Sequence, residues 1–291
     1  MGNYFKIYFL FLIPSCLALG LGFYANYSGQ VEKSISDFEN HYDKHTQIYA
    51  DQIKEIEHFY ELVMQNAIKG IQKEVNSKII DKASLQNIAT KYNVSHLFLI
   101  DKNGKFTHST NEDPSKIPNL YQFSPQYINL IGSTKLKYLT TPIILPYPER
   151  EPHKFLTIWS KNQFIEVGVR ITEIAKNITK MLDLDKNIVQ ADMKIGEELY
   201  TVKSNITSSD DTFDTVKQIK IANKNYSQSK NGMKHTYELR FHVSKEELNS
   251  GIVSIKTRYL TNFLLTIGLI SLLLLLAIRF LQSRVERVTT T

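Results

Sequence analysis

Two short runs, 154–160 and 164–170, alternate in the manner of neighbouring β-strands and carry the best candidates for binding chemistry. Successive side chains of a strand point to opposite faces, so Trp159 is expected on one face with Glu166 and Arg170, while aliphatic side chains fill the other. An aromatic wall with a few charged groups is how proteins hold small polar ligands. The alternative is an exposed sheet face with a surface Glu–Arg pair and one buried Trp.

A proline-rich and tyrosine-rich segment before these strands can close over the same face. It contributes Tyr121, Tyr127 and Tyr138, whose rings would complete the aromatic wall. Arg170 would then pair with an anionic group of the ligand, and Glu166 with a cationic group or with Arg170 itself. The sequence therefore predicts a small-molecule site between a sheet and a crossover segment.

Other groups with chemical potential are incomplete. Motifs for phosphate binding, nucleophilic serine, zinc proteolysis and paired cysteines are all missing from the sequence, so we predict no catalytic residue and no enzyme. His41 and His45 share a helix face and could hold a metal ion, but no acidic or cysteine ligand at a clear spacing completes the set. Cys16 is the single cysteine. We therefore predict no metal site and no cofactor.

The net charge of +6 arises from basic residues that are interleaved with acidic ones. Such interleaving is typical of a solvated surface and gives no basic stripe for nucleic acid. Because a clustered positive face is absent from the sequence, we expect no nucleic-acid partner.

Two apolar segments, 5–24 and 259–278, are each long enough for a transmembrane helix, which needs about 20 apolar residues. A cleaved signal peptide is the alternative for the first segment, but it ends in a poor cleavage site. Basic residues follow the second segment directly, at Arg279 and beyond, and such residues mark the cytoplasmic side. We predict a two-pass protein of the inner (plasma) membrane with both termini cytoplasmic and residues 25–258 outside.

A long helix is predicted directly after the first apolar segment. Apolar residues recur at alternating spacings of three and four from Val31 to Val75, which gives a heptad-like stripe without a proline. The stripe can cover a sheet, and its membrane-near part can also pair with a second copy of the chain. We therefore expect a homodimer through this helix.

The next elements read as a short helix and an antiparallel sheet. Ser84 resembles a helix N-cap. Apolar runs on both sides of Asn103-Gly104 predict a hairpin with a type I′ turn. Three further strands are expected: 136–145 and the pair 154–160 and 164–170 described above. A helix then follows to about Leu184.

This order resembles a Cache-family, PAS-like extracytoplasmic sensor domain of bacterial transmembrane receptors. The resemblance covers 28–184 and is carried by the long helix and by the run Leu97–Gly104, an apolar strand that ends in Asp before a turn Gly. It implies a five-stranded antiparallel sheet packed on the long helix. It also implies sensing of a small molecule or of a periplasmic protein.

Amino-acid-binding members of the family carry an Arg-x-Trp-Tyr run ahead of a strand, and the comparable place here reads Lys135-Leu136-Lys137-Tyr138. Tyr138 matches, Lys135 stands for the Arg, and the Trp is absent, so a small carboxylate or another anion is an open alternative to an amino acid. The complete candidate set is Tyr121, Tyr127, Lys135, Tyr138, Trp159, Glu166 and Arg170.

Beyond the first sheet, four β-like runs predict a smaller β-rich unit, as in double-Cache receptors: 188–195, 199–204, 216–222 and 235–243. Ser244 and Glu247 resemble a capping box that starts a helix continuing into the second apolar segment.

The expected fold class is α+β, with five parts along the chain. They are transmembrane helix 1 (5–24), the long helix with the membrane-distal PAS-like domain (25–184), the smaller membrane-proximal unit with its connecting helix (185–258), transmembrane helix 2 (259–278) and a short cytoplasmic tail (279–291). The expected function is a sensory input module whose output lies downstream or in a partner. One alternative is a two-span envelope scaffold with a protein-binding external domain, and a second is a membrane-anchored enzyme whose site carries no recognised motif.

Overall fold

The computed structural model describes residues 2–77, 79–111, 113–133, 137–146, 150–196, 198–204, 212–220 and 236–289. The chain divides into two compact units. The first comprises Met1–His41 and Lys245–Thr291, and the second comprises Tyr42–Ser244. Helix α1 (Gly2–Ser77) is unbroken over 76 residues.

The first unit consists of the start of α1 and of α5 (Glu246–Thr289). Both helices are long and apolar enough to cross a membrane, judged by length and composition alone. Within this unit the ring of Phe23 lies 5.5 Å from that of Phe263, so the two apolar segments pack side by side. Helix α5 continues from its first turn into the apolar segment without a break, as the sequence predicts.

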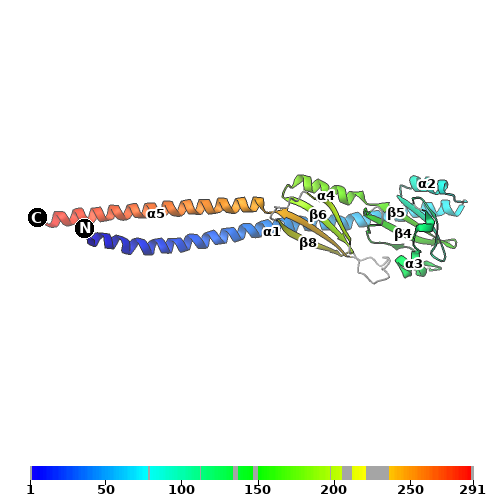
Figure 1. Cartoon of the computed structure of the whole chain (residues 1–291), viewed down its shortest axis with the longest axis horizontal. Coiled ribbons are helices and arrows are strands. Elements are labelled where there is room, and N and C mark those ends of the chain that lie inside the picture. Colours follow the sequence, from blue (N-terminus) through cyan, green and yellow to red (C-terminus); the bar gives the residue numbers. More distant parts are fainter. Residues whose placement is uncertain are drawn as a thin grey trace. The chain divides into compact units, whose positions relative to one another are not determined.

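The second unit contains the expected five-stranded antiparallel sheet, in the order β2-β1-β5-β4-β3. Figure 1 shows this sheet beside α2 and α3. The strands are β1 (His96–Asp101), β2 (Phe106–Ser109), β3 (Leu139–Thr140), β4 (His153–Ser160) and β5 (Gln163–Arg170). The short helices are α2 (Lys82–Lys91), η1 (Pro114–Lys116), α3 (Leu120–Phe123) and η2 (Pro125–Leu130), the last three forming the crossover between β2 and β3.

The first hairpin is where the sequence places it, but its turn type is different. Only Gly104 has positive φ there, at +81°, whereas a type I′ turn needs two such residues. The Gly104 N–H donates to the Asp101 carbonyl and the Asp101 N–H to the Lys105 carbonyl, which defines a three-residue loop with Gly in the left-handed position. The two-residue turn with positive φ at both positions instead joins β4 to β5, at Lys161 and Asn162.

Two further predictions are corrected. The strand expected over 136–145 shrinks to β3 and one isolated bridge between Ile144 and His153. Pro142 lies between them and has no N–H to donate to a ladder. The N-cap of α2 is Asp81, whose carboxylate accepts from the Ser84 N–H at 2.8 Å, so Ser84 lies inside the first turn.

The two faces of the five-stranded sheet have the predicted strand parity. Leu156, Ile158 and Val167 face α1 and pack against Met64 and Ile71. The opposite face carries aromatic side chains, which pack against the crossover.

The buried stripe of α1 differs from the expected one because it includes polar residues. Buried positions recur every three or four residues, at Tyr42, Thr46, Ala50, Ile53, Glu57, Glu61, Met64, Ile68, Ile71 and Val75. Lys154 of β4 lies opposite Glu57, with its Nζ 2.7 Å from Glu57 Oε1 and 3.8 Å from Glu61 Oε2. The face expected to be wholly apolar thus contains a buried ion network, which a search for apolar periodicity cannot find.

The second sheet confirms the smaller β-rich unit and has the order β7-β6-β9-β8 (Figure 1). Its elements are β6 (Ile188–Ile195), β7 (Glu198–Ser204), β8 (Thr212–Lys220) and β9 (Thr236–Ser244), preceded by α4 (Thr172–Leu184). Alternate residues of β9, including Leu239 and Phe241, are buried. Phe241 packs against Tyr49, so α1 covers this sheet as well.

Candidate ligand-binding site

A cavity of about 720 Å³ lies between the five-stranded sheet and the crossover. Pockets for small molecules commonly occupy 300–1,000 Å³ and are mostly apolar with few polar groups. The cavity fits this description, being lined by His96, Phe98, Phe106, Lys116, Ile117, Pro118, Leu120, Phe123, Tyr127, Thr141, Ile144, Leu145, Pro146, Phe155 and Glu166.

The sheet side of the cavity is an aromatic floor made by rings from β2, β1 and β4, and β5 lies between the last two strands. Phe98 of β1 packs edge-on against Phe106 of β2, with ring centroids 5.4 Å apart. Gly168 of β5 pairs with Phe155 of β4 and His96 of β1. A Cβ there would come within 2.5 Å of the Phe155 ring, so only glycine allows this ring to lie flat over β5.

The crossover side is fixed to the turn between β1 and β2. The Leu120 N–H donates to the Gly104 carbonyl at 2.8 Å, and Asn119 Nδ2 donates to the Asn103 carbonyl at 2.8 Å. The Tyr121 hydroxyl donates to the Lys102 carbonyl. These hydrogen bonds hold the crossover at a fixed distance from the sheet. The cavity is the space between the two.

Glu166 is the polar centre of the floor. It is 7% exposed, and its Oε2 accepts a hydrogen bond from the Thr157 hydroxyl at 2.5 Å. Burial raises the pKa of Glu166 from 4.5 to about 7, and the bond from Thr157 offsets part of that rise. Near neutral pH the Glu166 carboxyl group can therefore donate a proton when it is neutral or pair with a cation when it is ionised.

A pair of buried histidines adjoins the aromatic floor. The rings of His96 and His153 meet edge-on with centroids 4.9 Å apart, and His153 Nδ1 lies 2.8 Å from the Glu151 carbonyl oxygen. His96 lines the cavity itself, while its Nδ1 lies 3.0 Å from Ser95 Oγ. A ligand over Phe98 and Phe155 would therefore contact an imidazole edge as well as a carboxyl group.

Four of the residues expected at the site lie on this side of the sheet. Tyr127 and Glu166 line the cavity. Trp159 and Tyr121 lie beside it and pack on Phe164, with ring centroids 4.7 and 6.2 Å away.

Two others, Tyr138 and Arg170, are not brought together with them. The Tyr138 hydroxyl donates to Glu61 Oε1 at 3.1 Å, so this ring lies on the α1 face of the sheet. Arg170 ends β5 and pairs with Glu151 at 2.8 Å while remaining 43% exposed. Lys135 lies outside the described residues.

The sequence reasoning missed the aromatic floor. Phe98 belongs to a strand that reads as almost uniformly apolar, and Phe155 is as apolar as Leu156 on the other face of its strand, so hydrophobicity alone does not separate the two faces. The parity of His96 and Phe98, which alternate with Leu97 and Leu99, was the available signal.

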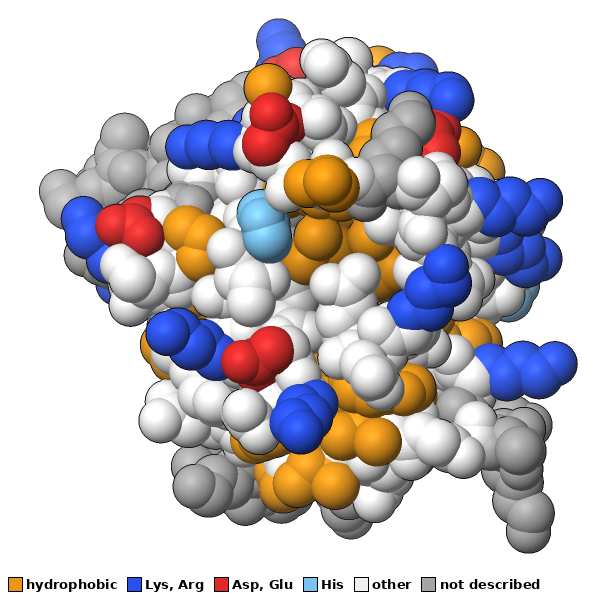
Figure 2. Space-filling model, turned by 90° about the vertical axis from the view of Figure 1, so that its right-hand side faces the viewer, with side chains coloured by type: hydrophobic (Ala, Val, Ile, Leu, Met, Phe, Trp, Pro, Cys, Tyr) orange, Lys and Arg blue, Asp and Glu red, His pale blue; other side chains and the backbone are white. Residues whose placement is uncertain are grey.

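Figure 2 shows the end of the second unit that carries α2 and the five-stranded sheet. Hydrophobic side chains reach the surface there, and charged side chains of both signs are scattered among them. No large area of one sign dominates this view.

No protein-family model matches this chain. No curated protein matches it either.

Several solved structures resemble it in fold. The ligand-binding domain of the Pseudomonas fluorescens chemoreceptor CtaA, in complex with L-isoleucine, is 12% identical, with a TM-score of 0.43, over 76% of this chain and 98% of that chain. The ligand-binding domain of the Pseudomonas aeruginosa amino-acid chemoreceptor PctC, in complex with GABA, is 9% identical, with a TM-score of 0.42, over 71% of this chain and 100% of that chain. The sensory domain of the Campylobacter jejuni chemoreceptor Tlp3, with isoleucine bound, is 10% identical, with a TM-score of 0.40, over 74% of this chain and 97% of that chain. All three are ligand-binding or sensory domains.

Proposed function

We propose that this chain is the extracytoplasmic ligand-sensing input module of a transmembrane signal-transduction receptor. The observation that carries the proposal is the cavity of about 720 Å³, which has an aromatic floor and a buried carboxyl group at Glu166. Its size and composition suit a small molecule.

The ligand is a small molecule with an apolar body and a cationic group. Rings at Phe98 and Phe155 offer the apolar contacts, and Glu166 offers the polar one. Lys116 lines the exposed side of the cavity and would take an anionic group. This arrangement fits molecules that carry both charges, and it fits a plain carboxylate less well because the buried partner is itself an acid.

Sensing requires that the ligand bind two arrangements of the domain unequally. Helix α5 follows β9 directly and continues into the second apolar segment, so it is the element that would carry the difference. Both termini are cytoplasmic in this proposal, and 25–258 lie outside. Alkaline phosphatase fused at Asn187 should be active, and activity only in a fusion near Thr289 would contradict the topology.

The receptor is a homodimer through α1. Ile48, Phe59 and Leu62 are large, exposed and on one side of this helix, because Phe59 lies eleven residues, or about three turns, after Ile48 and Leu62 follows Phe59 by three residues. In a Cys16→Ser background, Phe59→Cys should form a disulfide-linked dimer in membranes, and Lys54→Cys, on another side, should not. Equal cross-linking of both variants would contradict this interface.

Ligand screening by thermal shift on the full chain in nanodiscs tests the binding site. A stabilising small molecule should lose its effect in Glu166→Gln, because the amide cannot pair with a cation. Arg170→Ala is the matched control, since Arg170 pairs with Glu151 away from the cavity lining. A ligand that stabilises Glu166→Gln as much as the natural protein would place binding elsewhere.

The second candidate is an envelope scaffold with a protein-binding external domain. It is favoured by three exposed apolar side chains of the crossover, Phe123, Ile128 and Ile131. Substituting Ile128 and Ile131 by Ser, with the cavity-lining Phe123 kept, should leave the small-molecule response intact if the chain is a ligand sensor. Loss of a co-purifying partner in that variant, without any small-molecule response in the natural protein, would support the scaffold.

A further inference from the structure

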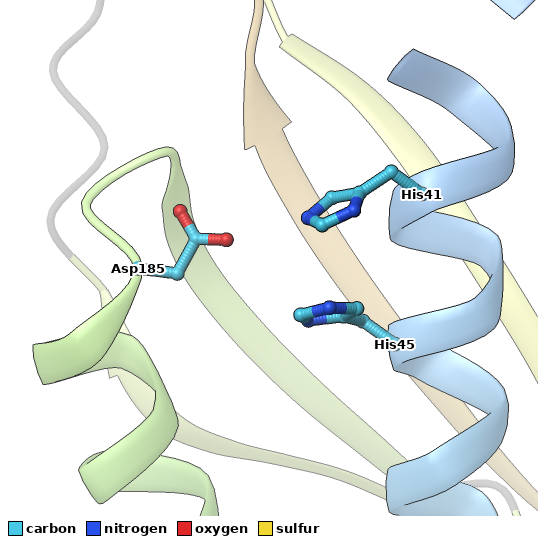
Figure 3. A group of neighbouring side chains, drawn as sticks. All are labelled: His41, His45 and Asp185. Atoms are coloured by element: carbon cyan, nitrogen blue, oxygen red, sulfur yellow. The ribbon is translucent and has the colours of Figure 1, made fainter. Parts of the chain in front are cut away.

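Two histidines of α1 lie one turn apart on the same side of the helix. His41 and His45 are separated by four residues, and α1 is unbroken there, so both imidazoles project in one direction (Figure 3). His41 is exposed and His45 is partly exposed. By themselves they supply two of the three or four protein ligands that a bound metal ion needs.

The third ligand comes from a distant part of the sequence. Asp185 lies in the turn between α4 and β6, and its carboxylate faces the two imidazole rings (Figure 3). One ligand atom of each of the three residues lies within 4.8 Å of the other two. Around a tetrahedral zinc ion such atoms are about 3.3 Å apart, as metal–ligand bonds of about 2.0–2.1 Å require. The difference is at most about 1.5 Å, which small rotations of the three side chains close.

The carboxylate of Asp185 is already held in place by a second set of groups. Its Oδ1 accepts from the Asn187 N–H at 3.0 Å and from the Tyr42 hydroxyl at 3.4 Å. Asn187 Nδ2 in turn donates to the Tyr42 hydroxyl oxygen at 3.0 Å, and Tyr42 is buried. Metal-binding carboxylates are characteristically oriented by such outer hydrogen bonds. Since Oδ1 is engaged, Oδ2 is the oxygen left to face an ion.

We propose that His41, His45 and Asp185 bind a divalent transition-metal ion of the zinc class. Two imidazole nitrogens and one carboxylate oxygen are a typical set for zinc, whereas calcium and magnesium prefer oxygen ligands throughout. Three protein ligands leave a fourth position for water or for an external ligand. This site is distinct from the cavity at Glu166, which is built by other elements.

Metal binding would cross-link α1 to the turn that precedes β6, the first strand of the second sheet. Any ion that binds only the folded arrangement stabilises it in proportion to its concentration over its Kd. A metal bound here therefore raises the temperature at which the second sheet unfolds.

The test uses the full chain in detergent, purified without a polyhistidine tag and stripped of metal with a chelator. Zn²⁺ titrated by calorimetry should bind with one equivalent per chain and raise the unfolding temperature. Co²⁺ should give the visible absorption of a tetrahedral site. His45→Gln and Asp185→Asn should each weaken Zn²⁺ binding at least about tenfold, because even outer partners of metal ligands contribute 10- to 100-fold.

Two matched controls separate this site from adventitious binding. His58→Gln changes an exposed histidine of the same helix, and Asp183→Asn changes an exposed acid two residues from Asp185, so both should bind Zn²⁺ as the natural protein does. Tyr42→Phe removes the hydroxyl that holds the carboxylate and should weaken binding with little change in the metal-free unfolding temperature. Unchanged Zn²⁺ affinity in His45→Gln or Asp185→Asn, or the absence of stoichiometric binding, would overturn the proposal.

Discussion

The two sheets of the second unit both pack against α1, but their charged side chains lie on opposite faces relative to this helix. In the five-stranded sheet, Lys154 points toward α1 and is fully buried with Glu57. In the four-stranded sheet, the charged side chains alternate with the buried apolar ones of β9, and Arg240 is 42% exposed beside Glu238. Among the described residues, no ion pair lies over the floor on the opposite face of the first sheet, and the crossover encloses a mostly apolar cavity there.

A second contrast lies in what covers each sheet. The first sheet carries the irregular crossover as a third layer, hydrogen-bonded to the turn at Gly104. The polar face of the second sheet is occupied by side chains that bind one another: His242 Nε2 lies 2.9 Å from Asp192 and its Nδ1 lies 2.7 Å from Asp214. A ligand cavity thus requires a covering layer that does not itself fill the space.

The largest expected effect comes from the buried ion network. Lys154→Met leaves Glu57 and Glu61 buried without their cation and should lower the free energy of unfolding by about 3–5 kcal/mol. The matched change in the second sheet, Arg240→Met, should cost less than about 1 kcal/mol because its ion pairs are partly solvated. Thermal unfolding of the full chain by circular dichroism measures both. Equal losses in the two variants would show that burial does not distinguish the networks.

The turn glycines give the next largest contrast. Gly104→Val combines positive φ with a Cβ that would come within 2.4 Å of Asn119 Oδ1, and should cost about 3 kcal/mol. Gly196→Val, in the turn between β6 and β7, has a similar φ of +62° but open space around it, so backbone strain of about 1 kcal/mol is expected. Gly104→Val should also abolish ligand stabilisation. If both variants lose the same free energy of unfolding, the contact between Gly104 and the crossover does not contribute to the difference in stability.

The pH dependence of stability is expected to reflect Glu166. Its pKa is raised in the folded protein, so the folded state binds more protons than the unfolded state between pH 4.5 and about 7. Stability therefore falls as pH rises through this window, by up to about 3 kcal/mol. Glu166→Gln should remove this component of the slope when unfolding is followed at pH 5, 6 and 7. An unchanged slope would mean that Glu166 is ionised throughout.

The smallest effect is expected at the exposed end of β5. Arg170→Ala breaks an ion pair with Glu151 in which both side chains are more than 40% exposed, and should cost at most about 1 kcal/mol. Ligand binding in the cavity should be unchanged. A loss of binding would return Arg170 to the site that the sequence predicts for it.

The sequence by itself determines the parts that depend on local periodicity. Two apolar segments of membrane-spanning length, a long helix, and strands with Leu156 and Val167 on one face all follow from spacings of two to four residues. The hairpin at Asn103-Gly104 is located correctly, but its turn type is not, because loop length depends on how β1 and β2 align. Such features need no knowledge of distant residues.

Only the tertiary structure decides the groups that meet across long sequence distances. Glu57 pairs with Lys154, and Asp185 lies beside His41 and His45, because strand pairing and helix packing bring them together. The spacing of residues along the sequence does not reveal these contacts. Charged members of these groups are also invisible to a search for apolar stripes. The cavity is of the same kind, because its floor depends on which faces of β1, β4 and β5 align, and its volume depends on how high the crossover is held above them.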